Sequence, residues 1–293
     1  MSEPVLVTGA TGKQGGAAVH ALKAAGVPVR ALVRDPLAER AKALDVELVA
    51  GDLNDRDSLV GAAKGARAVF SVQMALPTED GFDFPGELTQ AMNLVQAALE
   101  AGVPQFIQTT VDGAGERITD GRFPVMEASL NTKAEIQDRV REAGFERWTL
   151  LKPGFFMENF LPSSAFLFPR GIEGGLVSLL RPATRLSLVA VRDIGTAVAA
   201  AVADPERFDR VELELASDHL SMTEIAAVLS DAFGASLSAP DMTLEQASAA
   251  GMPGMAAGHD RLNETGMAGR PEYARALGLP LTSFAEWAKT LTP

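Results

Sequence analysis

The chain has no cysteine among its 293 residues, and this absence excludes several kinds of chemistry at once. Without a thiol there is no disulfide bond, no thiolate nucleophile and no cysteine-ligated zinc site. Histidine is also scarce, because only His20, His219 and His259 occur, far apart and without the spacing of metal ligands. We therefore expect these histidines to be surface or packing residues, and we expect no metal site.

Long apolar runs are missing as well. No stretch of about 18 apolar residues occurs, so no segment is expected to span a membrane. The first residues do not combine a basic segment with an apolar core and a small-residue cleavage site, as a secretory signal peptide would. We therefore expect a cytoplasmic protein.

The chain also lacks an excess of positive charge. Its 26 Lys and Arg residues face 38 Asp and Glu residues, which gives a net charge of −12. Such a surface repels a nucleic-acid backbone, so direct nucleic-acid binding is not expected, although a local basic pocket can still hold one phosphorylated ligand. An apolar content of 47% is ordinary for a globular protein, and the length suits one large α/β domain with a smaller attachment.

What the sequence does contain, close to its beginning, is a glycine-rich turn between a short apolar strand and an Ala-rich helix. Gly9 lets the chain turn sharply, Gly12 lets the backbone approach a pyrophosphate, and Gly15 lets the helix pack closely. The N-terminus of the helix then offers unpaired N–H groups and a partial positive charge to phosphates. We interpret the turn as a dinucleotide site and not merely a structural turn. The turn residues assigned to this site are Gly9, Thr11, Gly12, Lys13, Gln14 and Gly15.

Strand-like and helix-like segments alternate through the first half of the chain. Strands are predicted over 5–7, 29–33, 46–50, 69–72, 105–109 and 148–151, and helices from about residue 14 and over 56–64, 86–101 and 130–143. This alternation predicts a Rossmann-type doubly wound parallel sheet with helices on both faces. We expect residues 1–153 to form the dinucleotide-binding domain. Residues 154–293 are expected to form a smaller α/β lobe, with some segments returning to the sheet.

In the second half the pattern loosens. A helix is predicted over 193–203, a strand over 211–215 and further helices over 222–233 and 283–290. The Met-rich segment 239–269 is interpreted as a helix followed by a flexible loop.

The end of the second predicted strand bears on the choice of cofactor. An acidic residue there binds the ribose of NAD, whereas a basic residue accommodates the 2′-phosphate of NADP. Arg34 follows the strand directly, and Lys13 in the glycine turn adds a second positive charge. A planar guanidinium matches phosphate geometry, so NADP(H) is favoured over NAD(H). The alternative is that Arg34 is a solvated residue paired with Asp35.

The ends of the next two strands supply further candidate contacts. Asp52 and Leu53 would lie beside the adenine, unless Asp52 instead caps the following helix, which Asp55 and Asp57 could also do. Val72 and Gln73 end the fourth strand, where a ligand at the carboxyl edge of the sheet should pass. The loops 78–85 and 113–122 also follow strand ends and are expected to border the site.

Taken together, these residues resemble the short-chain dehydrogenase/reductase superfamily, and specifically its atypical NmrA-like branch with the HSCARG-type redox sensors. The resemblance is carried by the stretches 8–15 (TGATGKQG), 33–36 (VRDP), 51–52 (GD), 131–133 (NTK) and 151–160 (LKPGFFMENF). It implies NADP(H) binding in the first half of the chain. It also implies that Lys133 anchors the nicotinamide ribose.

The same resemblance exposes a departure. Ordinary members of the superfamily use a Tyr-x-x-x-Lys pair, in which the tyrosine exchanges a proton with the substrate. Here Ser129 stands four residues before Lys133, and the only tyrosine is Tyr273. A serine hydroxyl is a poor proton donor near neutral pH. Thr109 and Thr110 stand where the superfamily places a hydroxyl residue that orients the substrate, so Thr110 joins Lys133 as a candidate catalytic residue.

An aromatic segment follows the sixth predicted strand. Pro153 and Phe156 are assigned to the cofactor site, and the neighbouring Phe155, Met157 and Phe160 are candidates for a pocket over the nicotinamide. The position after a strand's carboxyl end favours a pocket, while clustered aromatic residues equally suit a core.

Three hypotheses remain at this point. In the first, the protein is an NADPH-dependent reductase of a conjugated acceptor such as a quinone. In the second, it is a non-catalytic NADPH/NADP⁺ sensor that acts on a regulatory protein. In the third, Lys133 has no role in the cofactor site and is only a solvated helix residue. A sugar-nucleotide epimerase is disfavoured, because that chemistry depends on the missing tyrosine. The sequence leaves the oligomeric state open.

Overall fold

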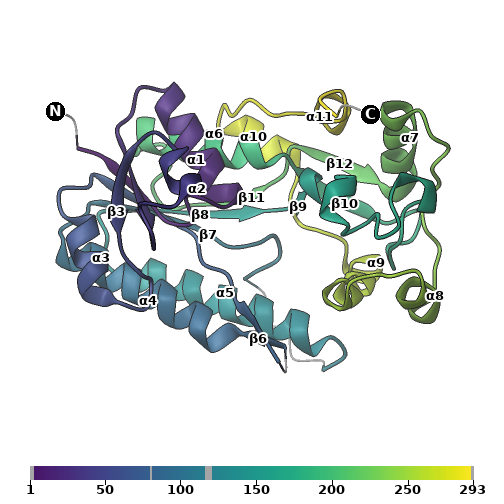
Figure 1. Cartoon of the computed structure of the whole chain (residues 1–293). Coiled ribbons are helices and arrows are strands. Elements are labelled where there is room, and N and C mark those ends of the chain that lie inside the picture. Colours follow the sequence, from purple (N-terminus) through teal and green to yellow (C-terminus); the bar gives the residue numbers. More distant parts are fainter. Residues whose placement is uncertain (1–2, 80, 116–120, 292–293) are drawn as a thin grey trace. The chain divides into compact units, whose positions relative to one another are not determined.

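The computed structural model describes residues 3–79, 81–115 and 121–291 (Figure 1). Residue 80 in the predicted loop 78–85, and residues 116–120 in the predicted loop 113–122, lie outside the described residues. The chain divides into two compact units, each built from more than one stretch. The first contains Met1–Thr119, Glu127–Lys152 and Val191–Leu213, and the second contains Asp120–Met126, Pro153–Ala190 and Glu214–Pro293.

The first unit is built on a seven-stranded sheet with the order β11-β8-β7-β4-β1-β2-β3. Its strands are β1 (Val5–Val7), β2 (Val29–Val33), β3 (Glu47–Ala50), β4 (Ala68–Ser71), β7 (Gln105–Thr109), β8 (Arg147–Pro153) and β11 (Val211–Leu215). From β3 to β8 each strand pairs with its neighbour in parallel. The predicted doubly wound Rossmann-type sheet is confirmed, and β2, β7 and β11 have the predicted bounds.

The strand order reverses between β1 and β4, and in sheets of this kind ligands bind in the crevice at such a reversal. The fully buried Thr8 follows β1 and joins the two sides of this reversal. Its Oγ1 accepts a hydrogen bond from the backbone N–H of Val72 at 2.8 Å. The turn after β1 and the chain leaving β4 are therefore held together where a ligand is expected.

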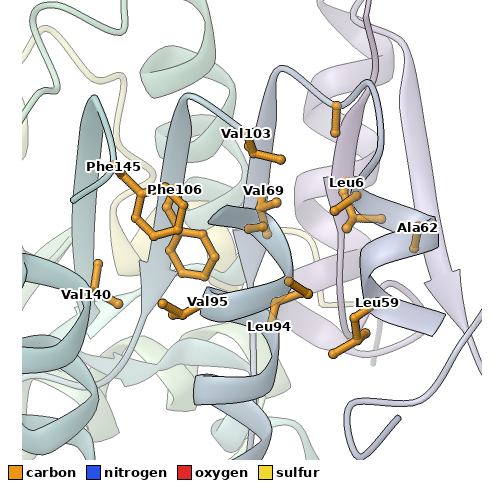
Figure 2. Close-up of a cluster of buried hydrophobic side chains, with 14 of the residues drawn as sticks. Leu6, Leu59, Ala62, Val69, Leu94, Val95, Val103, Phe106, Val140 and Phe145 are labelled. Atoms are coloured by element: carbon orange, nitrogen blue, oxygen red, sulfur yellow. The ribbon is translucent and has the colours of Figure 1, made fainter. Parts of the chain in front are cut away.

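Helices cover both faces of the sheet (Figure 1). The helices of this unit are α1 (Lys13–Ala24), α2 (Glu39–Lys42), α3 (Arg56–Ala63), α4 (Phe84–Glu100), α5 (Pro124–Glu142) and α6 (Val191–Ala203). Helices α3, α4 and α5 lie on one face, while α1 and α6 lie on the other. Figure 2 shows the core under the first group, where Leu59 and Leu94 from the helices meet Val69 and Phe106 from the strands.

Helices α1 and α6 pack unusually close together. A Cβ atom at Gly195 of α6 would lie 2.2 Å from the carbonyl oxygen of Ala17 in α1. Since real Cβ atoms do not approach a carbonyl oxygen so closely, only glycine fits at this position.

The C-terminal ends of the helices were predicted more accurately than their N-terminal starts. Glycines predicted to end four of the helices all have positive φ, between 70° and 87°, at Gly26, Gly65, Gly102 and Gly144. Helix α5, however, begins at Pro124 and not at the predicted residue 130. A proline is well placed at a helix start, because the N–H group that it lacks would have no partner there.

Two short strands, β5 (Leu76–Thr78) and β6 (Gly81–Asp83), form an antiparallel pair where the sequence predicted only a loop. This pair leads directly into α4. Asp83 caps that helix by accepting a hydrogen bond from the N–H of Gly86 at 2.8 Å.

The second unit has a three-stranded sheet with the order β12-β10-β9, in which β9 is parallel to β10 and β12 is antiparallel. Its elements are β9 (Phe155–Phe156), η1 (Met157–Phe160), η2 (Pro162–Ser164), η3 (Ile172–Gly174), β10 (Arg185–Val189), β12 (Asp218–Ser221), α7 (Met222–Phe233), α8 (Leu244–Ala249), η4 (Gly254–Arg261), α9 (Leu262–Thr265), α10 (Pro271–Ala276) and α11 (Phe284–Ala288). The helices of this lobe were partly predicted, but its three strands were not.

The Met-rich segment 239–269 was predicted as one helix and a flexible loop. The structure instead folds much of that predicted loop into the short helices η4 and α9. Among the described residues, no helix combines the length and apolar character needed to cross a bilayer.

Candidate cofactor site

The glycine turn after β1 has the close packing that the sequence predicted. Gly9 has a φ of 58°, in the left-handed region that favours glycine. A Cβ atom at Gly15 would lie 2.2 Å from the carbonyl oxygen of Gly9, and one at Gly12 would lie 3.2 Å from the same oxygen. The N–H of Gly12 donates to that oxygen at 2.8 Å, which closes the turn. The turn therefore tolerates no side chain at position 15.

The N-terminus of α1 is open to an anion. Gly12 is its N-cap and supplies no side-chain hydrogen bond, and the first turn contains no acidic residue. A helix N-terminus carries unpaired N–H groups and a partial positive charge, so it favours a bound phosphate. The cradle thus fits the pyrophosphate of a dinucleotide.

Two exposed cations belong to the same region of the first unit. The side chains of Arg34, after β2, and Lys13, in the first turn of α1, make no hydrogen bond or ion pair with any other described residue. The carboxylate of Asp35 is directed to the backbone, because its Oδ1 accepts the N–H of Leu37 at 2.8 Å. The alternative in which Arg34 pairs with Asp35 is therefore wrong. Both cations are available to an anionic ligand.

Asp52 after β3 does not cap α3. Its Oδ1 accepts hydrogen bonds from the backbone N–H and the side-chain amide of Asn54, at 2.8 and 3.0 Å. The cap is Asp55, which accepts the N–H of Ser58 at 3.3 Å. Leu53 is held in place because its carbonyl oxygen accepts the amide of Asn93 at 2.9 Å. A contact of Asp52 and Leu53 with adenine stays a prediction.

A polar network crosses the carboxyl ends of β4 and β7. Ser71 Oγ donates to Gln108 Oε1 at 2.7 Å, Gln73 Nε2 donates to Ser71 Oγ at 2.7 Å, and Gln108 Nε2 donates to Gln73 Oε1 at 3.0 Å. Thr109 Oγ1 donates to Gln14 Oε1 at 2.7 Å, which ties the end of β7 to α1. The network fixes the orientation of Gln14 and Gln73, two residues assigned to the cofactor. Gln108 was missed, because in the sequence it reads only as part of a strand.

Lys133, the expected ribose anchor, forms a largely buried ion pair across two helices. Its Nζ on α5 lies 2.5 Å from Oε1 of Glu87 on α4. The Lys133 side chain is 17% exposed and that of Glu87 only 2%. The hypothesis that Lys133 is a solvated helix residue is therefore wrong. Glu87 was missed by the sequence analysis, because a lone acidic residue in the first turn of a helix has an ordinary explanation in the helix dipole.

Ser129 and Gln137 stand one turn before and after Lys133 on α5. The side chain of Ser129 makes no hydrogen bond within the described part of the chain. Gln137 is fully buried, and its Nε2 donates to Oγ1 of Thr110 at 2.9 Å. This bond leaves the proton of the Thr110 hydroxyl free to point elsewhere, and a catalytic role for Thr110 stays a prediction. Tyr273 lies on α10 of the second unit and is 50% exposed.

A second cluster of charges links α5 to the edge of the sheet. Glu212 on β11 accepts hydrogen bonds from Nε and Nη2 of Arg141 at 2.7 and 2.8 Å, and from Nζ of Lys152 at 2.8 Å. The hydrogen bond from Arg141, with a further contribution from Lys152, lowers the pKa of Glu212 to about 2 against the effect of its partial burial. The cluster serves as a structural clamp between α5, β8 and β11.

The aromatic segment after β8 divides into core and non-core residues. Phe155, Met157 and Phe160 are buried in the hydrophobic core of the second unit, so for these three the core interpretation is correct. Phe156 is half-buried and does not belong to that core, while Pro153 ends β8. The assignment of Pro153 and Phe156 to the cofactor stays a prediction.

A parallel sheet whose order reverses at β1 and β4, together with a glycine turn leading into an uncapped helix, defines a Rossmann-type NAD(P)-binding protein. The family model described as the NmrA-like family matches residues 1–254. The chain belongs to the NmrA-like family.

Known proteins similar to this chain include reductases and a regulator. An NAD(P)H azoreductase of Xenophilus azovorans is 32% identical over 97% of this chain and 96% of its own length. The NADPH-dependent quinone oxidoreductase of Escherichia coli, solved with NADPH, has a TM-score of 0.78 at 23% identity, covering 98% of this chain and 99% of its own. NmrA, a negative transcriptional regulator solved with NAD, has a TM-score of 0.76 at 19% identity, covering 99% of this chain and 95% of its own. These two structures share the fold.

Proposed function

We propose that this protein is an NADPH-dependent reductase that transfers hydride to a small conjugated acceptor, such as a quinone or an azo compound. The observation that carries the proposal is the phosphate cradle with two unpartnered cations in a chain of net charge −12. Similarity to an azoreductase over 97% of the chain supports the acceptor class.

The cofactor is assigned to residues of the first unit. The N–H groups at the start of α1 bind the pyrophosphate, Arg34 and Lys13 bind the 2′-phosphate, and Lys133 binds the nicotinamide ribose. When bound, the reduced nicotinamide supplies the hydride. The preference for NADP(H) over NAD(H) follows from Arg34, because a guanidinium at this position matches a phosphate and offers no acceptor to a ribose hydroxyl.

The class of acceptor is inferred from the absence of the catalytic tyrosine. Ser129 occupies the place of the tyrosine that would hand a proton to a substrate alkoxide, and a serine hydroxyl does not supply that proton near neutral pH. A quinone or an azo group spreads the arriving negative charge over a conjugated system, so water can protonate it afterwards. We assign the binding of this acceptor to residues 154–293, and we place the protein in the cytoplasm, where NADPH is maintained as a reductant.

Steady-state oxidation of NADPH in the presence of quinones and azo dyes tests this function. We expect turnover with at least one acceptor class and a much lower kcat/KM with NADH. Tight binding of NADPH without turnover of any acceptor would contradict the reductase.

That outcome would favour a second candidate function, an NADPH/NADP⁺ sensor that acts on a regulatory protein. The missing tyrosine and the fold shared with the regulator NmrA support this candidate. Its test is whether NADPH and NADP⁺ change the capture of a partner protein in opposite directions.

A further inference from the structure

The imidazole ring of His259 lies in an aromatic cluster and makes no hydrogen bond within the described part of the chain. It packs roughly perpendicular to the rings of Phe155 and Phe166, with centroid distances of 5.4 and 5.6 Å, and the two phenyl rings are 6.4 Å apart. Nδ1 of the imidazole is buried. His259 as a whole is only half-buried, and Nε2 is the ring nitrogen that remains accessible.

Packing alone does not explain a histidine at this position. A buried ring nitrogen without a hydrogen bond destabilises the fold, and an apolar side chain of similar size would fill the space without that cost. Burial lowers the pKa of His259 to about 4, so the ring is neutral at pH 7. A polar side chain kept in this state calls for an explanation other than stability, such as the binding of a ligand.

The surroundings of the ring indicate which nitrogen carries its proton. A buried N–H group without an acceptor is rarer in proteins than a lone pair without a donor, so we assign the proton of the neutral ring to Nε2. The lone pair of Nδ1 then faces the core, and the N–H group lies at the accessible nitrogen. His259 therefore offers one hydrogen-bond donor and no charge.

Contacts on both sides of His259 fix the segment that carries the ring. A Cβ atom at Gly258 would lie 2.9 Å from Cε and 3.3 Å from Cβ of Met126, so η4 packs closely against Met126 directly before His259. Directly after it, Oδ1 of Asp260 accepts a hydrogen bond from Nδ2 of Asn263 at 2.8 Å. The backbone that carries the donor is therefore in place before a ligand binds.

We propose that Phe166 and His259 form a binding subsite for a planar conjugated acceptor, in which Nε2 of His259 donates a hydrogen bond to a carbonyl oxygen or an azo nitrogen. This inference rests on the proposed function, which assigns the acceptor to residues 154–293. Both side chains are half-buried, while Phe155 supports them from the core. Such rings suit an aromatic ligand, because aromatic groups pack face to edge or in offset stacks.

The hydrogen bond from His259 supplies part of what the missing tyrosine would supply. A quinone that has accepted hydride carries negative charge on an oxygen, and an N–H donor stabilises this charge as it develops. His259 keeps its proton throughout, because a neutral imidazole is a very weak acid. Water protonates the product afterwards, so the subsite needs no proton relay.

The test removes the N–H group and the ring separately. His259→Phe keeps an aromatic ring without a donor, whereas His259→Gln keeps a donor without the ring. His20→Phe is the matched control, since His20 is exposed and belongs to the first unit. Each protein is titrated with 1,4-naphthoquinone and with naphthalene, which has the same ring system but no hydrogen-bond acceptor. The KM and kcat of NADPH oxidation are measured with naphthoquinone.

We expect the wild type to bind naphthoquinone about tenfold more tightly than naphthalene, which is the effect of one hydrogen bond. His259→Phe loses this preference, and its kcat/KM for naphthoquinone falls about tenfold while its affinity for NADPH is unchanged. His259→Gln retains part of the preference but binds both ligands more weakly, and His20→Phe behaves as wild type.

A nuclear magnetic resonance measurement on the wild type, labelled with ¹⁵N in its histidines, adds a test that needs no variant. We expect the proton of His259 on Nε2, and we expect naphthoquinone to shift the resonance of that nitrogen but not the ring resonances of His20. This measurement decides the matter even if a variant fails to fold.

The inference is overturned if His259→Phe keeps the wild-type preference for naphthoquinone, if the proton is found on Nδ1, or if the wild type binds neither ligand. Normal turnover of naphthoquinone by His259→Phe would place the acceptor elsewhere and leave the reductase intact. Binding of naphthoquinone at His259 without turnover of any acceptor would count against the reductase alone. The two failures are therefore distinguishable.

Discussion

The guanidinium of Arg141 on α5 donates two hydrogen bonds to the carboxylate of Glu212 on β11, at 2.7 and 2.8 Å. Because this pairing lowers the pKa of Glu212 from 4.5 to about 2, Glu212 stabilises the fold above pH 4.5. That stabilisation is lost as the pH falls from 4.5 towards 2. The side chain is 32% exposed, so solvent screening limits the effect to about 1–2 kcal/mol.

Urea unfolding at a series of pH values checks this prediction. Glu212→Gln should unfold at a lower urea concentration than the wild type at pH 7, and the gap should narrow as the pH falls below 4.5 and close near pH 2. A gap that persists at low pH would mean that the carboxylate is not the source of the stabilisation.

His259 produces a separate effect at higher pH. Its ring lies between those of Phe155 and Phe166, with centroid distances of 5.4 and 5.6 Å, and its Nδ1 is buried without a hydrogen-bond partner among the described residues. Burial lowers the pKa of His259 from 6.5 to about 4, so the folded state disfavours the protonated ring. The contribution of the neutral His259 ring to the free energy of unfolding is fully present above pH 6.5. On the order of 2–3 kcal/mol of it is lost as the pH falls towards 4.

Thermal unfolding at pH 7 and pH 5 measures this loss. We expect His259→Leu to remove most of the difference between the two values, whereas the same substitution at the exposed His20 leaves it unchanged. An identical pH response in wild type and His259→Leu would assign the effect to other groups.

The glycine turn predicts a sharp contrast between two glycine-to-alanine substitutions. At Gly15 the new methyl group would lie 2.2 Å from the carbonyl oxygen of Gly9, which costs about 1–3 kcal/mol and distorts the phosphate cradle. At Gly61, inside α3, a Cβ atom has no neighbour within 4 Å, and alanine should stabilise the helix by about 0.5–1 kcal/mol. Chemical denaturation measures the stability of both variants, and titration with NADPH measures their affinity for the cofactor. Normal cofactor binding by Gly15→Ala would contradict the assignment of the cradle.

Arg34 is expected to select the cofactor. Arg34→Ala should weaken NADPH about tenfold or more, since it removes a charge-assisted contact to the 2′-phosphate, and should leave NADH nearly unchanged. Arg56→Ala, which removes an exposed arginine from α3, serves as the control. Fluorescence titration with NADPH and with NADH gives the ratio of the two dissociation constants for each variant. An equal loss for both would remove the phosphate role from Arg34.

Local patterns in the sequence predicted the sheet and the turn. Strands β2 and β7 could be predicted because each follows a helix that ends in glycine, Gly26 or Gly102, and contains apolar residues. The constraint at Gly15 follows from glycine spacing in a strand–turn–helix context. Each of these features depends on residues within a few positions of one another. Residues that are neighbours along the chain are therefore sufficient to predict them.

Contacts between distant segments could not be predicted in this way. The pairing of Glu87 with Lys133 joins residues 46 positions apart on two helices. Gln137 is a polar helix residue that is fully buried, and its burial depends on distant partners, because its Nε2 donates to Oγ1 of Thr110 at 2.9 Å and to the carbonyl oxygen of Ala114 at 2.6 Å. The two-residue strand β9 is too short for alternation to reveal, and it depends on the close approach of Gly154 to Ser187.

The contact between Gly195 and Ala17 has a consequence for how an anion is received. Ala17 lies one turn behind the start of α1, and α6 packs against that turn through Gly195. The helix end proposed to bind the phosphates therefore has little freedom to pivot, and its N–H groups are preorganised. Under the proposed function, binding of a pyrophosphate then costs little conformational entropy, because the packing of α6 against α1 has already fixed the helix that binds it.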